Sequence, residues 1–113
     1  MINRSHLIFL LLVSLLSACH NTSFDSVKWK NWKEIDGTND RWDMSDDLID
    51  NYLKKGITIK EVEILLSDSL TKQETGNIDL YYSLGPCRSG ISYGGLTITF
   101  RNGKLEKISR TCR

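Results

Sequence analysis

The sequence has 113 residues, with 15 Lys and Arg against 14 Asp and Glu, and its formal net charge is +1. This length is enough for one small domain with its own core and too short for two. If residues 1–18 are removed as a leader, the remaining 95 residues carry 14 basic and 14 acidic side chains. This neutral balance argues against bulk nucleic-acid binding.

The first 18 residues have the pattern of a secretory signal, which we expect to be removed. A short basic start precedes ten apolar-rich residues from 7 to 16, whereas a membrane-spanning helix needs about 20 residues. An uncleaved membrane anchor is the alternative. The stretch Leu16-Ser17-Ala18-Cys19 places small residues before a cysteine and resembles a bacterial lipobox, in which the thiolate accepts the diacylglyceryl group. We therefore predict that Cys19 is acylated and begins the mature chain.

Residues 19–39 are predicted to form a lipidated tether. They are polar and rich in turn-forming residues, and they show no sustained apolar period. Within this stretch, residues 28–33 interleave Trp29 and Trp32 with lysines, a composition that is typical of a bilayer interface. The alternative, that one of these indoles packs back onto the domain, stays open.

Two helices are predicted after the tether. Residues 41–55 should form the first, because Met44 and Leu48 begin an apolar stripe at the helical period. The second should begin at a capping box formed by Thr58 and Glu61. We expect it to end near residue 67, and we expect residues 68–76 to be a loop because they are polar and without period.

Three strands are predicted in the remainder of the chain. Residues 77–84 alternate apolar and polar side chains, and residues 96–101 and 104–111 follow, joined by a tight turn at Asn102-Gly103. Leu105 and Ile108 are three residues apart, so they cannot share one face of a regular strand, and we expect a bulge near positions 106 and 107. The predicted fold is α+β: two N-terminal helices packed on one face of a three-stranded antiparallel meander, as one domain over residues 40–113.

Charge is unevenly distributed along the chain. Residues 34–50 hold seven acids and one Arg, whereas residues 88–113 hold six bases and one Glu. Either the two parts form oppositely charged faces that attract each other, or the basic sheet meets acidic protein or phospholipid headgroups. On the second interpretation, the partner-facing residues are predicted to be Arg101, Lys104, Lys107 and Arg110.

Cys87 and Cys112 are the two thiols that remain once Cys19 carries lipid. Disulfides are the rule in an oxidising compartment such as the periplasm, so we predict an internal bridge. Because a middle strand separates the outer two by about 9.6 Å, the loop after Pro86 should fold across the end of the sheet to close this bond. The alternatives are two unpaired thiols or a bond to another subunit.

The helix, helix and meander pattern resembles the SmpA/OmlA lipoproteins, relatives of the small BamE subunit of the outer-membrane β-barrel assembly machine. The resembling residues are Arg41, Met44, Asp47 and Leu48, then Gly56, Ile57, Thr58, Glu61, Val62, Leu65 and Leu66, then Tyr81, Tyr82, Leu84 and Gly85, and finally Leu96, Ile98, Phe100, Gly103, Leu105 and Ile108. The resemblance implies a β-lactamase-inhibitor-protein-like fold and a location at the periplasmic face of the outer membrane. His20, next to the lipidated cysteine, permits delivery to that membrane.

No enzymatic activity is expected from this sequence. His20 is the single histidine after processing, so a histidine-based triad or zinc site is not expected, and neither is any other metal or cofactor. We expect a lipid-anchored, monomeric accessory or scaffold protein of the cell envelope that binds another envelope protein, in outer-membrane assembly or maintenance. The alternatives are an inhibitor or immunity lipoprotein that blocks a periplasmic hydrolase or toxin, and a tethered domain without a dedicated partner.

Overall fold

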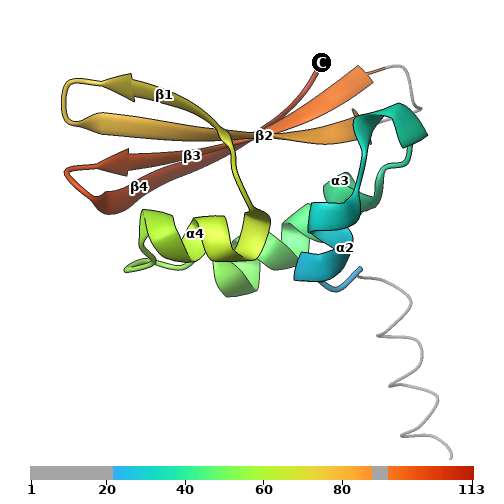
Figure 1. The fold of residues 1–113 in the computed structure, drawn as a ribbon, viewed down its shortest axis with the longest axis horizontal. Coiled ribbons are helices and arrows are strands. Elements are labelled where there is room, and N and C mark those ends of the chain that lie inside the picture. Colours follow the sequence, from blue (N-terminus) through green and yellow to red (C-terminus); the bar gives the residue numbers. More distant parts are fainter. Residues whose placement is uncertain (1–21, 88–91) are drawn as a thin grey trace, which may run out of the picture.

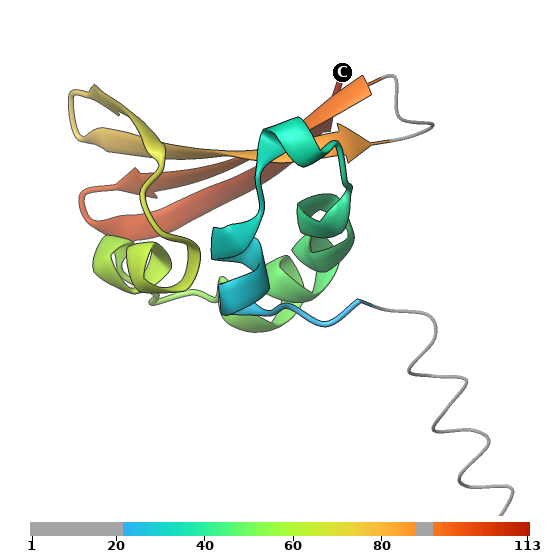
Figure 2. The same ribbon diagram turned by 45° about the vertical axis from the view of Figure 1, so that its right-hand side comes forward.

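The computed structural model describes residues 22–87 and 92–113, which form two layers. Short helices cover one face of a four-stranded antiparallel sheet (Figures 1 and 2). The helical elements are α2 (Ser26–Asn31), η1 (Glu34–Asp36), α3 (Asp40–Asp47), the π-helix η2 (Leu48–Tyr52) and α4 (Ile59–Leu66). The strands are β1 (Leu70–Glu74), β2 (Asn77–Cys87), β3 (Ser92–Arg101) and β4 (Lys104–Cys112), in spatial order β1-β2-β3-β4.

The predicted α+β class, with helices before an antiparallel sheet, is confirmed, but the sheet has four strands where three were predicted.

The expected leader over residues 1–18 and the expected lipidation site Cys19 lie outside the described residues. Among the residues that are described, no helix is long and apolar enough to cross a membrane.

Strand β1 lies where a loop was predicted. All five of its side chains are exposed, so it has no apolar alternation that could mark it as a strand. It pairs with β2 from Leu70 opposite Tyr81 to Glu74 opposite Asn77, across a two-residue turn in which Gly76 has a φ of 75°. A glycine adopts this conformation without strain. Pairing with β2, and not a pattern of buried side chains, therefore makes residues 70–74 a strand.

The first predicted helix is divided into α3 and η2, and it ends at Tyr52, earlier than predicted. The backbone N–H of Leu53 donates to the carbonyl of Leu48 at 2.9 Å, five residues back. This wider turn brings the two leucines to one side of the helix, which a 3.6-residue period would not do. Leu48 is fully buried and Leu53 is 3% exposed.

The capping box at the start of α4 is confirmed. The N–H of Glu61 donates to Thr58 Oγ1 at 3.1 Å, and the N–H of Thr58 donates to Glu61 Oε1 at 3.2 Å. The helix then buries Val62 and Leu66 against the sheet. It ends before Ser67, whose φ is 64°.

The predicted bulge in β4 is also present. Phe100 lies opposite Leu105, but Thr99 lies opposite Lys107, so Glu106 is the extra residue. The extra residue places Ile108 opposite Ile98 and returns it to the helix-facing side with Leu105.

The expected tether over residues 19–39 is not what the structure shows for its described part, because Phe24, Trp29 and Trp32 pack on the domain. Trp29 is fully buried, with its ring centroid 6.1 Å from those of Phe24 and Tyr82. The Arg41 guanidinium carbon lies 4.6 Å from the ring centroids of both Trp29 and Trp32, and its Nε donates to the Trp29 carbonyl at 3.1 Å. The interpretation that an indole packs back onto the domain is therefore correct for Trp29.

Candidate protein-docking face

The four predicted partner-facing cations do not form one surface. Arg110 extends to the helix side of the sheet, where its Nη1 donates to Asp46 Oδ1 at 2.6 Å and to Ser45 Oγ at 2.7 Å. Its guanidinium carbon also lies 4.5 Å from the centroid of the Trp42 ring. These contacts join β4 to α3, so the structure gives Arg110 a role within the domain.

The other three cations lie near the β3–β4 turn. Arg101 Nε is 3.4 Å from Glu106 Oε1 and 3.3 Å from Asn77 Oδ1. Exposed ion pairs of this kind contribute little to stability. This pair does, however, give the Glu106 carboxylate, which is the one nearest to the turn, a cationic partner. Lys104 and Lys107 are exposed on β4.

A hollow of about 360 Å³ lies beside the β4 edge. Its lining residues are Lys55, Leu105, Glu106, Lys107 and Ile108. The two aliphatic residues are partly buried against the core. The hollow therefore has an apolar floor and two lysines at its rim.

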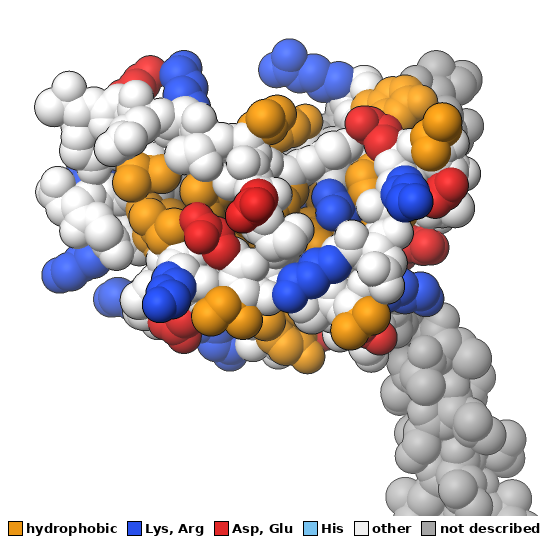
Figure 3. All heavy atoms as spheres, in the orientation of Figure 1, with side chains coloured by type: hydrophobic (Ala, Val, Ile, Leu, Met, Phe, Trp, Pro, Cys, Tyr) orange, Lys and Arg blue, Asp and Glu red, His pale blue; other side chains and the backbone are white. Residues whose placement is uncertain are grey.

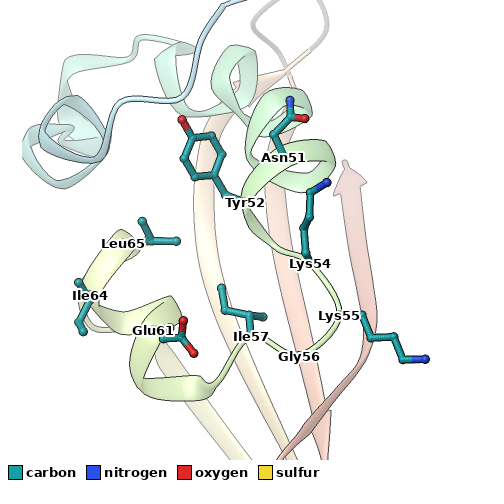
Figure 4. Close-up of a pocket in the computed structure, with 9 residues that line it drawn as sticks. All are labelled: Asn51, Tyr52, Lys54, Lys55, Gly56, Ile57, Glu61, Ile64 and Leu65. Atoms are coloured by element: carbon teal, nitrogen blue, oxygen red, sulfur yellow. The ribbon is translucent and has the colours of Figure 1, made fainter.

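A second hollow, of about 470 Å³, lies between η2 and α4 (Figure 4). Its lining residues are Asn51, Tyr52, Lys54, Lys55, Gly56, Ile57, Glu61, Ile64 and Leu65. Tyr52 is 41% exposed and Ile64 is 61% exposed, which is high for large apolar side chains. In the space-filling view, hydrophobic side chains reach the surface of the helical layer next to Lys and Arg side chains (Figure 3).

Lys55 lines both hollows, so the two hollows adjoin at this residue. Figure 4 shows the Lys55 side chain extending outward from the rim of the second hollow. We name this surface the docking face and define it by the residues that line the two hollows, together with the neighbouring Lys104: Asn51, Tyr52, Lys54, Lys55, Gly56, Ile57, Glu61, Ile64, Leu65, Lys104, Leu105, Glu106, Lys107 and Ile108.

The docking face carries an excess of positive charge. Among the described residues, no carboxylate lies within 4.0 Å of Lys54, Lys55, Lys104 or Lys107. Two acids also line the hollows: Glu61, which accepts hydrogen bonds from Thr58, and Glu106, which pairs with Arg101, so the four lysines outnumber them. An acidic partner would therefore find unpaired ammonium groups around apolar recesses.

Three groups whose pKa values are displaced by burial lie apart from the docking face. Burial lowers the pKa of Arg41 and raises the pKa of Tyr82 to about 12. Burial, followed by the nearby Asp40 and Asp46 carboxylates, raises the pKa of Asp43. None of these groups lines either hollow.

Cys87 and Cys112 lie at disulfide distance, with Cα atoms 6.0 Å apart. The predicted route was wrong, because β2 continues through Gly85 and Pro86 to Cys87, and the bond joins two strand residues. A register shift between Ser83 and Gly85 bends β2 at this point, and such a bulge carries the strand end out of the plane of the sheet. The bond pins the end of β2 to the C-terminal strand.

Sequence reasoning missed Lys54, Lys55 and Ile64 as surface-forming residues. The available signal was the pair of lysines before Gly56, together with an isoleucine that lies off the apolar stripe of its helix.

Within residues 22–87 and 92–113, no group of three or more His, Cys, Asp or Glu is placed to hold a metal ion. Comparisons with protein families, with curated proteins and with solved structures find no match for this chain.

Proposed function

We propose that this chain is a lipid-anchored accessory protein of the bacterial envelope, which binds another envelope protein through the docking face on the periplasmic side of the outer membrane. The observation that carries this proposal is that two partly apolar hollows adjoin at Lys55 and that their lysines have no acidic partner within the described residues. The lipobox-like residues 16–19 and the resemblance to SmpA/OmlA lipoproteins support the location.

Recesses with apolar floors and charged rims are typical of protein-binding surfaces. Buried aromatic and aliphatic anchors supply most of the binding free energy at such interfaces, and rim charges mainly set the association rate and the choice of partner. Tyr52, Ile64 and Leu105 are the anchors on the docking face, and the lysines are its rim. The preferred partner is therefore acidic.

Anchoring at Cys19 would hold this face close to the membrane. Phe24 is fixed on the domain, since its ring centroid lies 4.8 Å from that of Tyr52. Phe24 lies five positions after Cys19, and a fully extended stretch of this length reaches at most about 18 Å. The partner would then be a membrane protein or a protein held at the same bilayer.

Site-specific photo-crosslinking in intact cells tests this proposal. A photoreactive phenylalanine analogue at Tyr52, and a second probe at Lys55, should capture one envelope protein. Tyr93 is the matched control, because it is also an exposed tyrosine, 55% accessible, and it lies on the opposite face of the sheet. Capture of a barrel-assembly subunit or another resident envelope protein would support the accessory role. Capture of a single hydrolase or toxin would favour the inhibitor role, and equal capture through Tyr93 would contradict the docking face.

A further inference from the structure

Strand β4 forms an outer edge of the sheet. It is nine residues long, and β3 is its single neighbour within the described residues. Arg113, directly after the strand, exchanges both backbone hydrogen bonds with Tyr93, at 2.9 and 2.5 Å. Because antiparallel pairs alternate in this respect, the N–H and C=O groups of Ile108 and Arg110 point away from β3, toward the side on which a further strand would lie.

The space beside the first half of this edge is open. The hollow lined by Lys55, Leu105, Glu106, Lys107 and Ile108 lies there and reaches Ile108, the first of the two residues whose backbone groups point outward. Successive side chains of a strand placed there would alternate between two faces. Those on the helix side would meet Leu105 and Ile108, and those on the other side would meet Lys104 and Lys107.

The lysines on β4 determine which kind of segment can pair with this strand. Lysines and a bulge on an edge strand discourage pairing with an identical edge, and two copies of β4 would bring Lys104 and Lys107 toward like charges. The other edge strand, β1, balances its own charges, since Lys72 Nζ lies 3.2 Å from Glu74 Oε1. A second copy of this chain is therefore disfavoured at β4, whereas an acidic segment is favoured.

We propose that the β4 edge binds an extended acidic segment of the partner protein, which adds to the sheet as a fifth strand with alternating acidic and apolar residues. This inference rests on the proposed function, because it names the chemistry of the partner that the docking face receives. Main-chain hydrogen bonds to Ile108 and Arg110 hold the segment, and the lysines select its acidic side chains.

The test uses the full lipidated chain in nanodiscs and a short synthetic peptide of alternating Glu and Val. The peptide should slow amide exchange at Ile108 and Arg110 by about tenfold or more at saturation, because these edge amides are otherwise open to solvent. Added salt should weaken the binding, since the contacts with lysines are exposed. A peptide of alternating Lys and Val is the control and should not bind.

Proline variants separate edge pairing from side-chain contact alone. Ile108→Pro removes an outward N–H and should weaken binding of the Glu and Val peptide about tenfold, the equivalent of one lost hydrogen bond. Thr71→Pro is the matched control on the β1 edge and should leave binding unchanged. If Ile108→Pro fails to fold, amide protection of Ile108 and Arg110 in the unmodified chain decides whether the edge pairs, and the double variant Lys104→Glu and Lys107→Glu, which should abolish binding, tests the selection of acidic side chains.

Three results would overturn the inference. They are failure of the Glu and Val peptide to bind, binding without protection of Ile108 and Arg110, and equal binding of the Lys and Val peptide. These results do not bear on the docking face, which equal cross-linking through Tyr93 would contradict. A partner captured in cells through Tyr52 and Lys55 could bind by side-chain contacts without adding a strand. The two proposals therefore fail separately.

Discussion

The backbone N–H of Phe24 donates a 2.7 Å hydrogen bond to Oδ2 of Asp47. The same carboxylate accepts a 2.6 Å bond from Asn51 Nδ2 at its other oxygen. Both bonds favour the charged form, so they hold the pKa of Asp47 below its ordinary value. This contact fastens the N-terminal segment to the helical layer.

Replacement of Asp47 by Asn should therefore destabilise the domain in a pH-dependent manner. The pKa of Asp47 is lower in the folded state than the value of about 3.9 in the unfolded chain. The stabilisation that the Asp47 carboxylate provides is therefore fully present above the unfolded-state pKa, and it is lost as the pH falls through the folded-state pKa. Thermal unfolding of the native protein and of Asp47→Asn between neutral and strongly acidic pH measures this. A difference in Tm that stays constant into strong acid would contradict it.

Replacement of Trp29 by Ala should cost about 3–5 kcal/mol of unfolding free energy, because it empties a fully buried site between helix and sheet. Trp29→Phe should cost less, since it keeps a ring and removes an indole N–H that has no hydrogen-bond partner among the described residues. Ile35→Ala is the control, because that side chain is 91% exposed. Denaturant unfolding would show equal losses for Trp29→Ala and Ile35→Ala if the N-terminal segment were a tether.

Loss of the bond between Cys87 and Cys112 should lower the stability by roughly 3.5 kcal/mol in the chain-entropy model, for a sequence separation of 25 residues. Denaturant unfolding of the oxidised protein and of a Cys87→Ser, Cys112→Ser double variant provides the comparison. Mass spectrometry of the unreduced protein after alkylation checks the bond itself. Two alkylated thiols, or a dimer linked through either cysteine, would show that the bridge is absent.

Replacement of Cys19 by Ala should leave the protein soluble or unprocessed, because the acyl chains that we propose at this thiol would be missing. One chain alone binds a membrane weakly, and two or more hold it firmly. Fractionation of cells into membrane and soluble parts measures the effect. Retention of a processed Cys19→Ala protein in the membrane fraction would refute lipidation at this residue.

Charge reversal should separate the cations of the docking face from the structural arginine. The double variant Lys104→Glu and Lys107→Glu should slow association with the captured partner and reduce its salt dependence, with the Tm unchanged. Arg110→Glu should lower the Tm, because it places a carboxylate beside Asp46 and removes hydrogen bonds to Asp46 and Ser45. Unchanged association kinetics in the double variant would locate the partner surface elsewhere.

Features that depend on neighbours along the chain were predictable from the sequence. The capping box of Thr58 and Glu61, the Asn102-Gly103 turn and the bulge at Glu106 each involve residues no more than a few positions apart. Their geometry follows from hydrogen-bonding groups and side-chain spacing that any reader of the sequence can see. The α+β class follows as well, because two amphipathic helices and an amphipathic sheet need each other's apolar faces.

The tertiary structure decided what depends on distant partners. Strand β1 has only exposed side chains, and its pairing with β2 makes it a strand. Trp29 lies in a polar stretch, and its burial depends on Arg41 and Tyr82. The docking face arises because the chain folds Lys55 next to Ile108, 53 positions later. Periodicity reports which side chains share a face of one element, whereas the free energy of packing between elements determines which faces meet.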